Sequence, residues 1–113
     1  MRQARINYKG EHAGVLTQLD DGSYTFTYTE LWFIDSNKPP ISLTLSKYRQ
    51  THHSRIFFPF FFNMLPEGAN KDWLCRYFKL DKDDYFGQLV MAAKYDAIGA
   101  ITVDKIDINI EVA

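Results

Sequence analysis

Alternating apolar and polar residues in the first third of the chain predict β-strands. Between Ser23 and Tyr28, aromatic residues occupy every second position and Ser or Thr fills the others. This period is typical of a strand with one buried face, so the aromatic face is expected to lie toward the core. Earlier strands are expected over Arg5–Tyr8 and Ala13–Leu19, with turns at Lys9–Gly10 and 20–22. Together these segments predict a β-meander.

The middle of the chain predicts a short helix, a loop and a further strand. One helical turn is expected over 31–33. Polar residues and adjacent prolines make 35–40 a loop, because proline fits neither a helix interior nor a central strand. Apolar residues then alternate with Ser and Thr over Ile41–Leu45, which predicts a strand. The polar segment Lys47–Ser54 is expected to be a connection without regular structure.

The segment that follows predicts three principal helices, over Ile56–Leu65, Ala69–Phe78 and Tyr85–Ala93. In the second helix, Leu74 and Phe78 are four residues apart and define an inward-facing stripe. In the third helix, the apolar residues that share a face are Phe86, Leu89, Val90 and Ala93. Such spacing is typical of amphipathic helices that lie on a sheet.

The C-terminal segment predicts one more strand and leaves a hairpin open. Ala100–Val103 is apolar and follows a glycine. Residues 106–112 alternate strictly, and Asp104–Lys105 would be the turn that pairs them with this strand, although Asp-Lys is a poor type I′ pair. The 113 residues are expected to form a single domain over 1–113. Its expected fold class is α+β, a mostly antiparallel sheet of about five strands with the three principal helices packed on it in one layer.

The charge balance and the single cysteine exclude several classes of protein. The chain has 13 Lys and Arg against 14 Asp and Glu, so its net charge of −1 offers no positive field to nucleic acid or an anionic membrane. Cys75 is the only cysteine, which excludes an internal disulfide and a cysteine-rich zinc site. The longest strongly apolar run, Ile56–Phe62, is seven residues long, far short of a membrane span. A soluble, cytoplasmic protein is expected.

The remaining polar residues do not suggest catalysis. His52 and His53 are adjacent, so on a strand they would point to opposite faces and could not bind one metal ion together. Cys75 lies mid-helix beside Leu74 and is expected to be an inert thiol that is buried or half-buried. The acidic run 81–84 lacks the later Gly and Glu of a calcium loop, and no phosphate-binding glycine motif occurs. We therefore expect no catalytic, cofactor-binding or metal-binding residue, no enzyme activity and no ATP turnover.

Three segments resemble one protein family in their order and spacing. They are PISLTLS (Pro40–Ser46), FFPFFFNMLPEG (Phe57–Gly68), and Phe86 with LVMAAKYDAIGAI (Leu89–Ile101). The family pattern combines a proline with alternating leucine and serine, an Asn-Leu-Leu-Pro-Glu-Gly-like turn, a Phe-x-x-Leu helix and a Gly-x-Asp-x-x-Gly-Ala stretch. From about Arg5 to Val103, the chain is similar to the N-terminal subdomain of HipA-type serine/threonine kinase toxins.

The resemblance implies a role in binding another protein. In longer family members a kinase domain follows this subdomain and carries the catalytic and ATP-binding residues. The chain also resembles a HipS-like antitoxin, the short protein of tripartite HipB–HipS–HipT systems. Such a protein neutralises a HipT-like kinase toxin, and a HipB-like helix-turn-helix protein binds the operator DNA. The alternative is the N-terminal structural and regulatory subdomain of a full-length HipA-like kinase. The start at Met1 and a natural-looking terminal strand favour the separate antitoxin.

Two positions depart from the family pattern. Lys94 stands where the family usually has glycine, and Trp73 stands where a small residue is common. Exposed tryptophan is enriched at binding hot spots, so we predict that this indole and its neighbours bind the partner kinase. The predicted partner-binding residues are Trp73, Glu67, Gly68, Ala69 and Tyr77. The alternative is an indole folded onto the domain's own surface, where it covers Phe61 or Tyr77.

Overall fold

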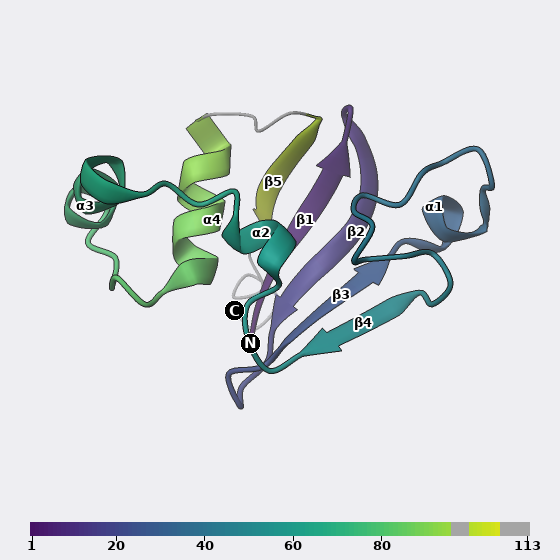
Figure 1. The fold of residues 1–113 in the computed structure, drawn as a ribbon, viewed down its shortest axis with the longest axis horizontal. Helices are drawn as coiled ribbons and strands as arrows, with labels where there is room; N and C mark the ends of the chain where they lie inside the picture. The colour runs from purple at the N-terminus through teal and green to yellow at the C-terminus, as the bar shows by residue number, and fades with distance from the viewer. Residues whose placement is uncertain (96–99, 107–113) are drawn as a thin grey trace, which may run out of the picture.

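The computed structural model describes residues 1–95 and 100–106, which form one antiparallel sheet and four helices (Figure 1). The strands are β1 (Arg2–Tyr8), β2 (Glu11–Gln18), β3 (Tyr24–Tyr28), β4 (Thr51–Ser54) and β5 (Ile101–Ile106). The helices are α1 (Glu30–Ile34), α2 (Pro59–Phe62), α3 (Gly68–Tyr77) and α4 (Tyr85–Tyr95). The strand order is β4-β3-β2-β1-β5, and each neighbouring pair is antiparallel. The predicted α+β class is confirmed.

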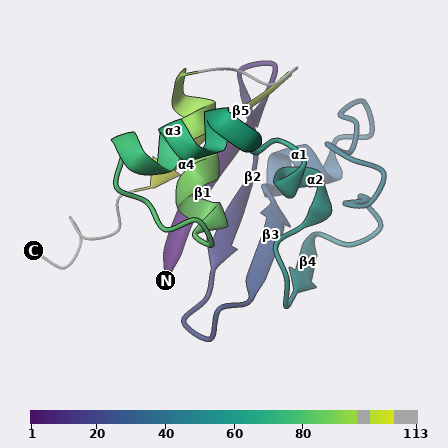
Figure 2. The same ribbon diagram turned by 60° about the vertical axis from the view of Figure 1, so that its left-hand side comes forward.

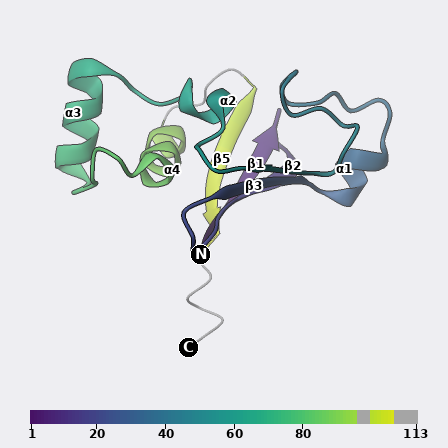
Figure 3. The ribbon, with the colours of Figure 1, turned by 60° about the horizontal axis from the view of Figure 1, so that its bottom comes forward.

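The helices at the β5 end of the sheet form two layers rather than one. Helix α4 packs on β5, and α3 packs on α4, so that α4 lies between α3 and the sheet (Figures 1 and 3). Figure 2 shows α3 crossing in front of α4. Helix α2 also contacts α4, whereas α1 contacts β2, the central strand of the sheet. The outer position of α3 leaves one of its faces without a covering element among the described residues.

The aromatic face of β3 forms the centre of the core, as predicted. Phe26 and Tyr28 are fully buried and Tyr24 is nearly so, whereas the threonines between them are only half-buried. Phe61 of α2 covers Phe26, with 5.8 Å between ring centroids. The predicted inward face of α4 is buried at Phe86, Leu89, Val90 and Ala93. Burial of each large side chain stabilises the fold by roughly 1.5–3 kcal/mol.

Two glycines meet different needs in the sheet: Gly10 allows the turn between β1 and β2, and Gly14 makes room for Phe26 of β3. Lys9 and Gly10 form the predicted turn with φ angles of 50° and 82°, and positive φ at both central residues is required by a type I′ hairpin. Gly14 lies under the Phe26 ring, where a Cβ atom would come within 2.5 Å of the ring carbon Cζ. A side chain at position 14 would therefore push this ring out of the core.

The predicted strand over Ile41–Leu45 is wrong, because this segment belongs to the loop between α1 and β4. Only two of its three apolar residues face the core, since Ile41 and Leu45 are buried and Leu43 is 94% exposed. The backbone turns instead of extending, and the Leu45 N–H donates to the Ser42 carbonyl oxygen at 3.1 Å. A strand would place all three apolar side chains on one face, whereas the turn leaves the middle one in solvent.

The fourth strand is β4, which lies in the segment predicted to be an irregular connection. It pairs with β3 at the edge of the sheet, and the hydroxyl oxygens of Thr27 and Thr51 are 3.1 Å apart. His52 and His53 lie on opposite faces, as expected for a strand. The half-buried His52 ring lies opposite Phe26, with Nε2 2.8 Å from the Ser46 carbonyl oxygen. An edge strand needs few apolar residues, so its sequence carries little pattern.

Tyr28 connects the core to this loop. The Ile41 N–H donates to the Tyr28 hydroxyl oxygen at 3.0 Å, and that hydroxyl donates to the Leu45 carbonyl oxygen. Burial raises the pKa of Tyr28, although the hydrogen bond from Ile41 partly offsets this, so the phenol remains neutral at pH 7. One buried hydroxyl thus pairs two backbone groups that would otherwise lack partners.

We expect Tyr28→Phe to lower the free energy of unfolding by about 1–3 kcal/mol, because it leaves a buried N–H and a buried carbonyl unpaired. Urea unfolding followed by circular dichroism measures this loss. Tyr48→Phe is the matched control, since the Tyr48 side chain is 97% exposed and its hydroxyl is expected to contribute nothing. Equal stabilities for the two variants would contradict the role assigned to Tyr28.

The predicted helix over Ile56–Leu65 is reduced to the single turn of α2. Pro59 takes the first helical position, and the residue before a proline is restricted to extended conformations, which Phe58 adopts with φ −58° and ψ 129°. After α2, the N–H groups of Met64 and Leu65 bond to carbonyls three residues earlier, at 3.1 and 3.0 Å. Such bonds mark tight turns rather than an α-helix. The other two predicted helices are confirmed as α3 and α4.

The predicted hairpin turn at Asp104–Lys105 is wrong, because β5 runs through both residues. They pair with β1, Asp104 opposite Arg5 and Lys105 opposite Ala4. Pairing with β1 gives the backbone N–H and C=O groups of this segment hydrogen-bond partners while it stays extended. The alternative, a tight turn with Asp-Lys at its centre, is unfavourable. The second arm of the predicted hairpin and the family positions 96–99 lie outside the described residues. Helix α4 continues through position 94, where the family usually has glycine.

Asp84 joins the start of α4 to β1. Arg2 donates from Nη2 to Asp84 Oδ1 at 2.6 Å and from Nη1 to Oδ2 at 3.1 Å. The Gly87 N–H donates to the same Oδ1 at 3.0 Å, which caps the helix. Burial raises the pKa of Asp84, but the hydrogen bonds from Arg2 and Gly87 and the charge of Arg2 outweigh it, so the pKa lies below its ordinary value.

We expect Asp84→Asn to lower the free energy of unfolding by about 1 kcal/mol at pH 7, because the amide keeps the cap but loses the ion pair. The folded-state pKa is depressed, so the carboxylate stabilises the fold above its ordinary value of 3.8 and stops doing so as the pH falls through the folded-state pKa. Urea unfolding should therefore show a difference between wild type and variant that is constant from neutral pH to about pH 5 and shrinks in stronger acid. A difference that persists unchanged in strong acid would contradict this account.

Candidate protein-binding surface

Helix α3 has a buried face and an exposed face of opposite character. It begins at Gly68, directly after the turn at Pro66–Glu67. The φ angle of Gly68 is +58°, which favours glycine at this position. Leu74 and Cys75 point inward and are buried, as predicted for both. Trp73 is 59% exposed and Tyr77 is 67% exposed, although both are large apolar side chains. Exposed aromatic residues one helical turn apart are uncommon on a surface without a partner.

The rings of Trp73 and Tyr77 are stacked on each other. Their centroids are 5.0 Å apart and their planes differ by 14°. Phe78 meets the edges of both rings, at 6.5 Å from Trp73 and 4.9 Å from Tyr77. The indole is thus held by its own helix, which agrees in part with the alternative that it covers Tyr77. Because more than half of the indole stays exposed, it remains available to a partner in a preformed orientation.

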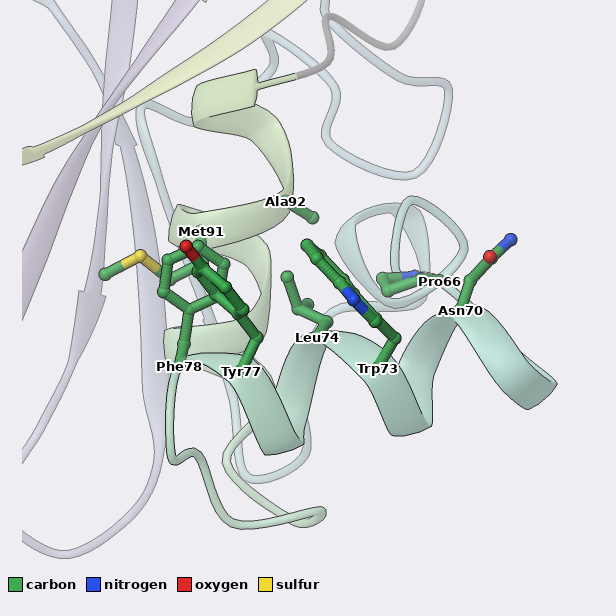
Figure 4. A pocket seen from close by; sticks show the side chains of 8 residues that line it. All are labelled: Pro66, Asn70, Trp73, Leu74, Tyr77, Phe78, Met91 and Ala92. Carbon is green, nitrogen blue, oxygen red and sulfur yellow. The ribbon is translucent and has the colours of Figure 1, made fainter.

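A groove runs beside this stack, between α3 and α4 (Figure 4). Its volume is about 560 Å³, and its lining residues are Pro66, Asn70, Trp73, Leu74, Tyr77, Phe78, Met91 and Ala92. Figure 4 shows Trp73 and Tyr77 along α3, with Met91 and Ala92 on the crossing helix. Seven of these eight residues are apolar or aromatic, so the groove suits an apolar side chain more than a polar ligand.

The structure brings together only part of the predicted site. Ala69, Trp73 and Tyr77 lie along one hollow on the outer face of α3, together with Asp72 and Arg76. Glu67 and Gly68 line a separate hollow at the start of the helix. Pro66 lines both that hollow and the α3–α4 groove, so the two are neighbours.

Sequence reasoning missed the α4 side of the groove. Met91 and Ala92 are half-buried beside the predicted core face of α4, and their exposure depends on how α3 crosses this helix. Their positions next to buried Val90 and Ala93 are the only signal in the sequence. Periodicity indicates which residues face the core, but not how far a neighbouring helix covers the residues on its border.

The polar residues of the described chain do not converge on a reactive centre. No group of three His, Cys, Asp or Glu side chains in residues 1–95 and 100–106 is arranged to hold a metal ion. His12 lies apart from the other histidines, near the first turn, and burial together with the charge of Arg5 lowers its pKa. Within the same residues, no helix is long and apolar enough to cross a membrane. The surface around α3 is marked instead by its exposed aromatic pair, Trp73 and Tyr77.

Comparison with known proteins agrees with the fold. The family model described as HipA N-terminal domain matches residues 4–104, almost the whole described chain. The chain belongs to the HipA N-terminal domain family. The resemblance seen in the sequence is therefore confirmed. A solved structure of the N-terminal domain of HipA toxin superimposes with a TM-score of 0.69 and covers 96% of this chain and 95% of that one. At 23% identity, this match shows a common fold.

The relatives that this chain matches are of two kinds, long and short. The putative kinase Y4dM of Sinorhizobium fredii is 32% identical over 106 residues, which are 87% of this chain and 25% of that protein. A second putative kinase of the same organism, Y4mE, is 32% identical over 71 residues, 63% of this chain and 17% of its own. An uncharacterized protein of Haemophilus influenzae is 26% identical over 105 residues, 93% of each chain. The chain thus spans a quarter or less of the two putative kinases and nearly all of a short relative.

Proposed function

We propose that this chain is a non-catalytic antitoxin subunit that binds and neutralises a HipT-like serine/threonine kinase toxin in a tripartite toxin–antitoxin system. Membership of the HipA N-terminal domain family gives the toxin–antitoxin context. The observation that supports binding is the stacked and exposed Trp73–Tyr77 pair beside an apolar groove. The two putative kinases among the relatives carry this domain within a much longer chain, which supports a kinase as the partner.

The proposed contact uses the outer side of α3. Trp73 enters a groove on the kinase, and the turn at Glu67 and Gly68 contacts the kinase surface next to it. The small side chain of Ala69 lets the partner backbone approach the helix. Tyr77 holds the indole in place because its ring is stacked on it. Because the rings are already stacked, few side-chain rotamers must be fixed on binding, which favours affinity.

Neutralisation in this scheme rests on binding alone. The chain supplies no catalytic group to the complex. It docks on the kinase at the place that the matching segment of a longer relative occupies within its own chain. The remaining proposed partner is a HipB-like helix-turn-helix protein that places the complex on operator DNA in the cytoplasm. With a net charge of −1, this chain offers no overall positive field for the DNA phosphates, so DNA contact is left to the HipB-like protein.

The proposal is tested by co-expressing the tagged chain with a kinase that lacks this domain and is encoded beside it. We expect the two proteins to co-elute in size-exclusion chromatography and the cells to survive kinase expression only when the chain is present. A chain that elutes alone while the kinase is soluble and active would refute the proposal. An open reading frame that continues into a kinase domain would instead make the chain one lobe of a longer protein.

A further inference from the structure

The outer face of α3 is complementary to itself. Its aromatic residues, Trp73 and Tyr77, are flanked on one side by Asp72 and Arg76, which carry opposite charges one helical turn apart. On an ideal helix, these flanking residues lie about 100° and 60° from Trp73, in the same direction around the axis. Both charged side chains therefore border one edge of the same aromatic stripe.

We propose that two copies of this chain associate through α3 in an antiparallel, twofold-symmetric pair, which covers the kinase-binding surface before a kinase is bound. This inference rests on the proposed function, because it concerns regulation of the same surface. The twofold axis is perpendicular to the helices and crosses them at the level of residues 74 and 75. It places the aromatic stripe of one copy on the aromatic stripe of the other. Trp73 of each copy then faces Tyr77 of the other.

The charges select the antiparallel direction. In that arrangement, the charged edge of one helix lies along the charged edge of the other, and the two chains run in opposite directions. Asp72 of each copy therefore lies near Arg76 of the other. A parallel twofold pair would place this charged edge against the opposite edge of the other helix, so Asp72 and Arg76 would gain no partner of opposite charge. Asp72 is 3.5 Å from Lys82 within its own chain, but both side chains are largely exposed, so this ion pair is weak and can be exchanged. Arg76 has no ion-pair partner among the described residues.

The contact is small, so the pair is expected to be weak. A single ten-residue helix presents less surface than a standard stable interface requires. A kinase that binds through a larger interface would therefore displace the second copy. The aromatic surface would then be shielded at high local concentration and free when the kinase is present.

Sedimentation equilibrium of the wild-type chain at low salt tests the inference. We expect the average mass to rise from 13.2 kDa towards twice that value as the concentration increases. Asp72→Arg and Arg76→Asp should each weaken self-association about tenfold, because each creates like-charge contacts in the pair. An equimolar mixture of the two variants should associate again, since each then meets the opposite charge. Circular dichroism of each variant controls for folding.

Several results would overturn the inference. A wild-type chain that stays monomeric at millimolar concentration excludes the pair without the need for any variant. Self-association that is unchanged in both single variants, or not restored in their mixture, places the contact elsewhere. Kinase binding is measured separately with a labelled chain at nanomolar concentration, where it is monomeric. A chain that binds kinase but does not self-associate refutes only this inference. A chain that self-associates but does not bind kinase refutes the proposed function and, with it, the regulatory role of the pair.

Discussion

Trp73→Ala is expected to weaken binding of the chain to its kinase at least tenfold and to weaken neutralisation to match. The indole is 59% exposed in the free chain and is already held by stacking on Tyr77, so most of its surface is available for burial in a partner. Truncation of a tryptophan at the centre of an interface costs on the order of 2 kcal/mol or more, which exceeds a tenfold change in Kd. Isothermal titration calorimetry with the purified kinase measures the loss.

The same substitution should leave the fold nearly unchanged. The ring contacts of Trp73 are with Tyr77 and Phe78, outside the central core, and loss of such a stack lowers stability by about 1 kcal/mol or less. Tyr48→Ala is the matched control for binding, because it removes an aromatic side chain that is 97% exposed on the loop between α1 and β4. Unfolding of Trp73→Ala, or kinase binding equal to that of the Tyr48 control, would remove Trp73 from the site.

Phe61→Ala is expected to have the largest effect on stability. Phe61 is fully buried and its ring lies between 5.2 and 6.4 Å from those of Phe26, Phe57, Phe58 and Phe60. Removing such a ring leaves a cavity that costs about 3–5 kcal/mol, a large share of the roughly 5–15 kcal/mol that stabilises a typical domain. The melting temperature and the urea midpoint should both fall sharply.

The adjacent phenylalanine supplies the control for this prediction. Phe62 is 46% exposed, and its ring meets the Tyr85 ring edge-on, with 5.4 Å between the centroids. We expect Phe62→Ala to cost less than about 1.5 kcal/mol, because the cavity that it leaves is open to water. Similar losses for the two variants would mean that α2 does not insert Phe61 into the core as described.

The elements predicted with most success are those whose side chains repeat in one clear period. The aromatic–threonine alternation before Tyr28 and the apolar face from Phe86 to Ala93 gave β3 and α4, because a continuous core selects one face of each element. The strand over Ile41–Leu45 failed for a different reason. Its buried residues are held by the hydroxyl of Tyr28, a distant hydrogen-bonding partner that no local pattern reveals.

The candidate site was predictable only in part. An exposed Trp73 beside Tyr77 follows from the helical position of Leu74, since residues four apart share a face and the neighbouring position turns away from the core. The groove depends on the crossing of α3 over α4, which is set by the side chains at their contact rather than by either sequence alone. Met91 therefore entered the site only through the structure.

A kinase activity titration tests the central claim most directly. Purified kinase from the neighbouring gene is mixed with increasing amounts of the chain, and phosphate transfer from ATP to its substrate, or to the kinase itself, is followed. The proposed function predicts that wild-type chain abolishes phosphate transfer once it is in excess over the kinase, and that Trp73→Ala does so only at concentrations at least about tenfold higher. Full kinase activity in the presence of saturating wild-type chain would contradict the account.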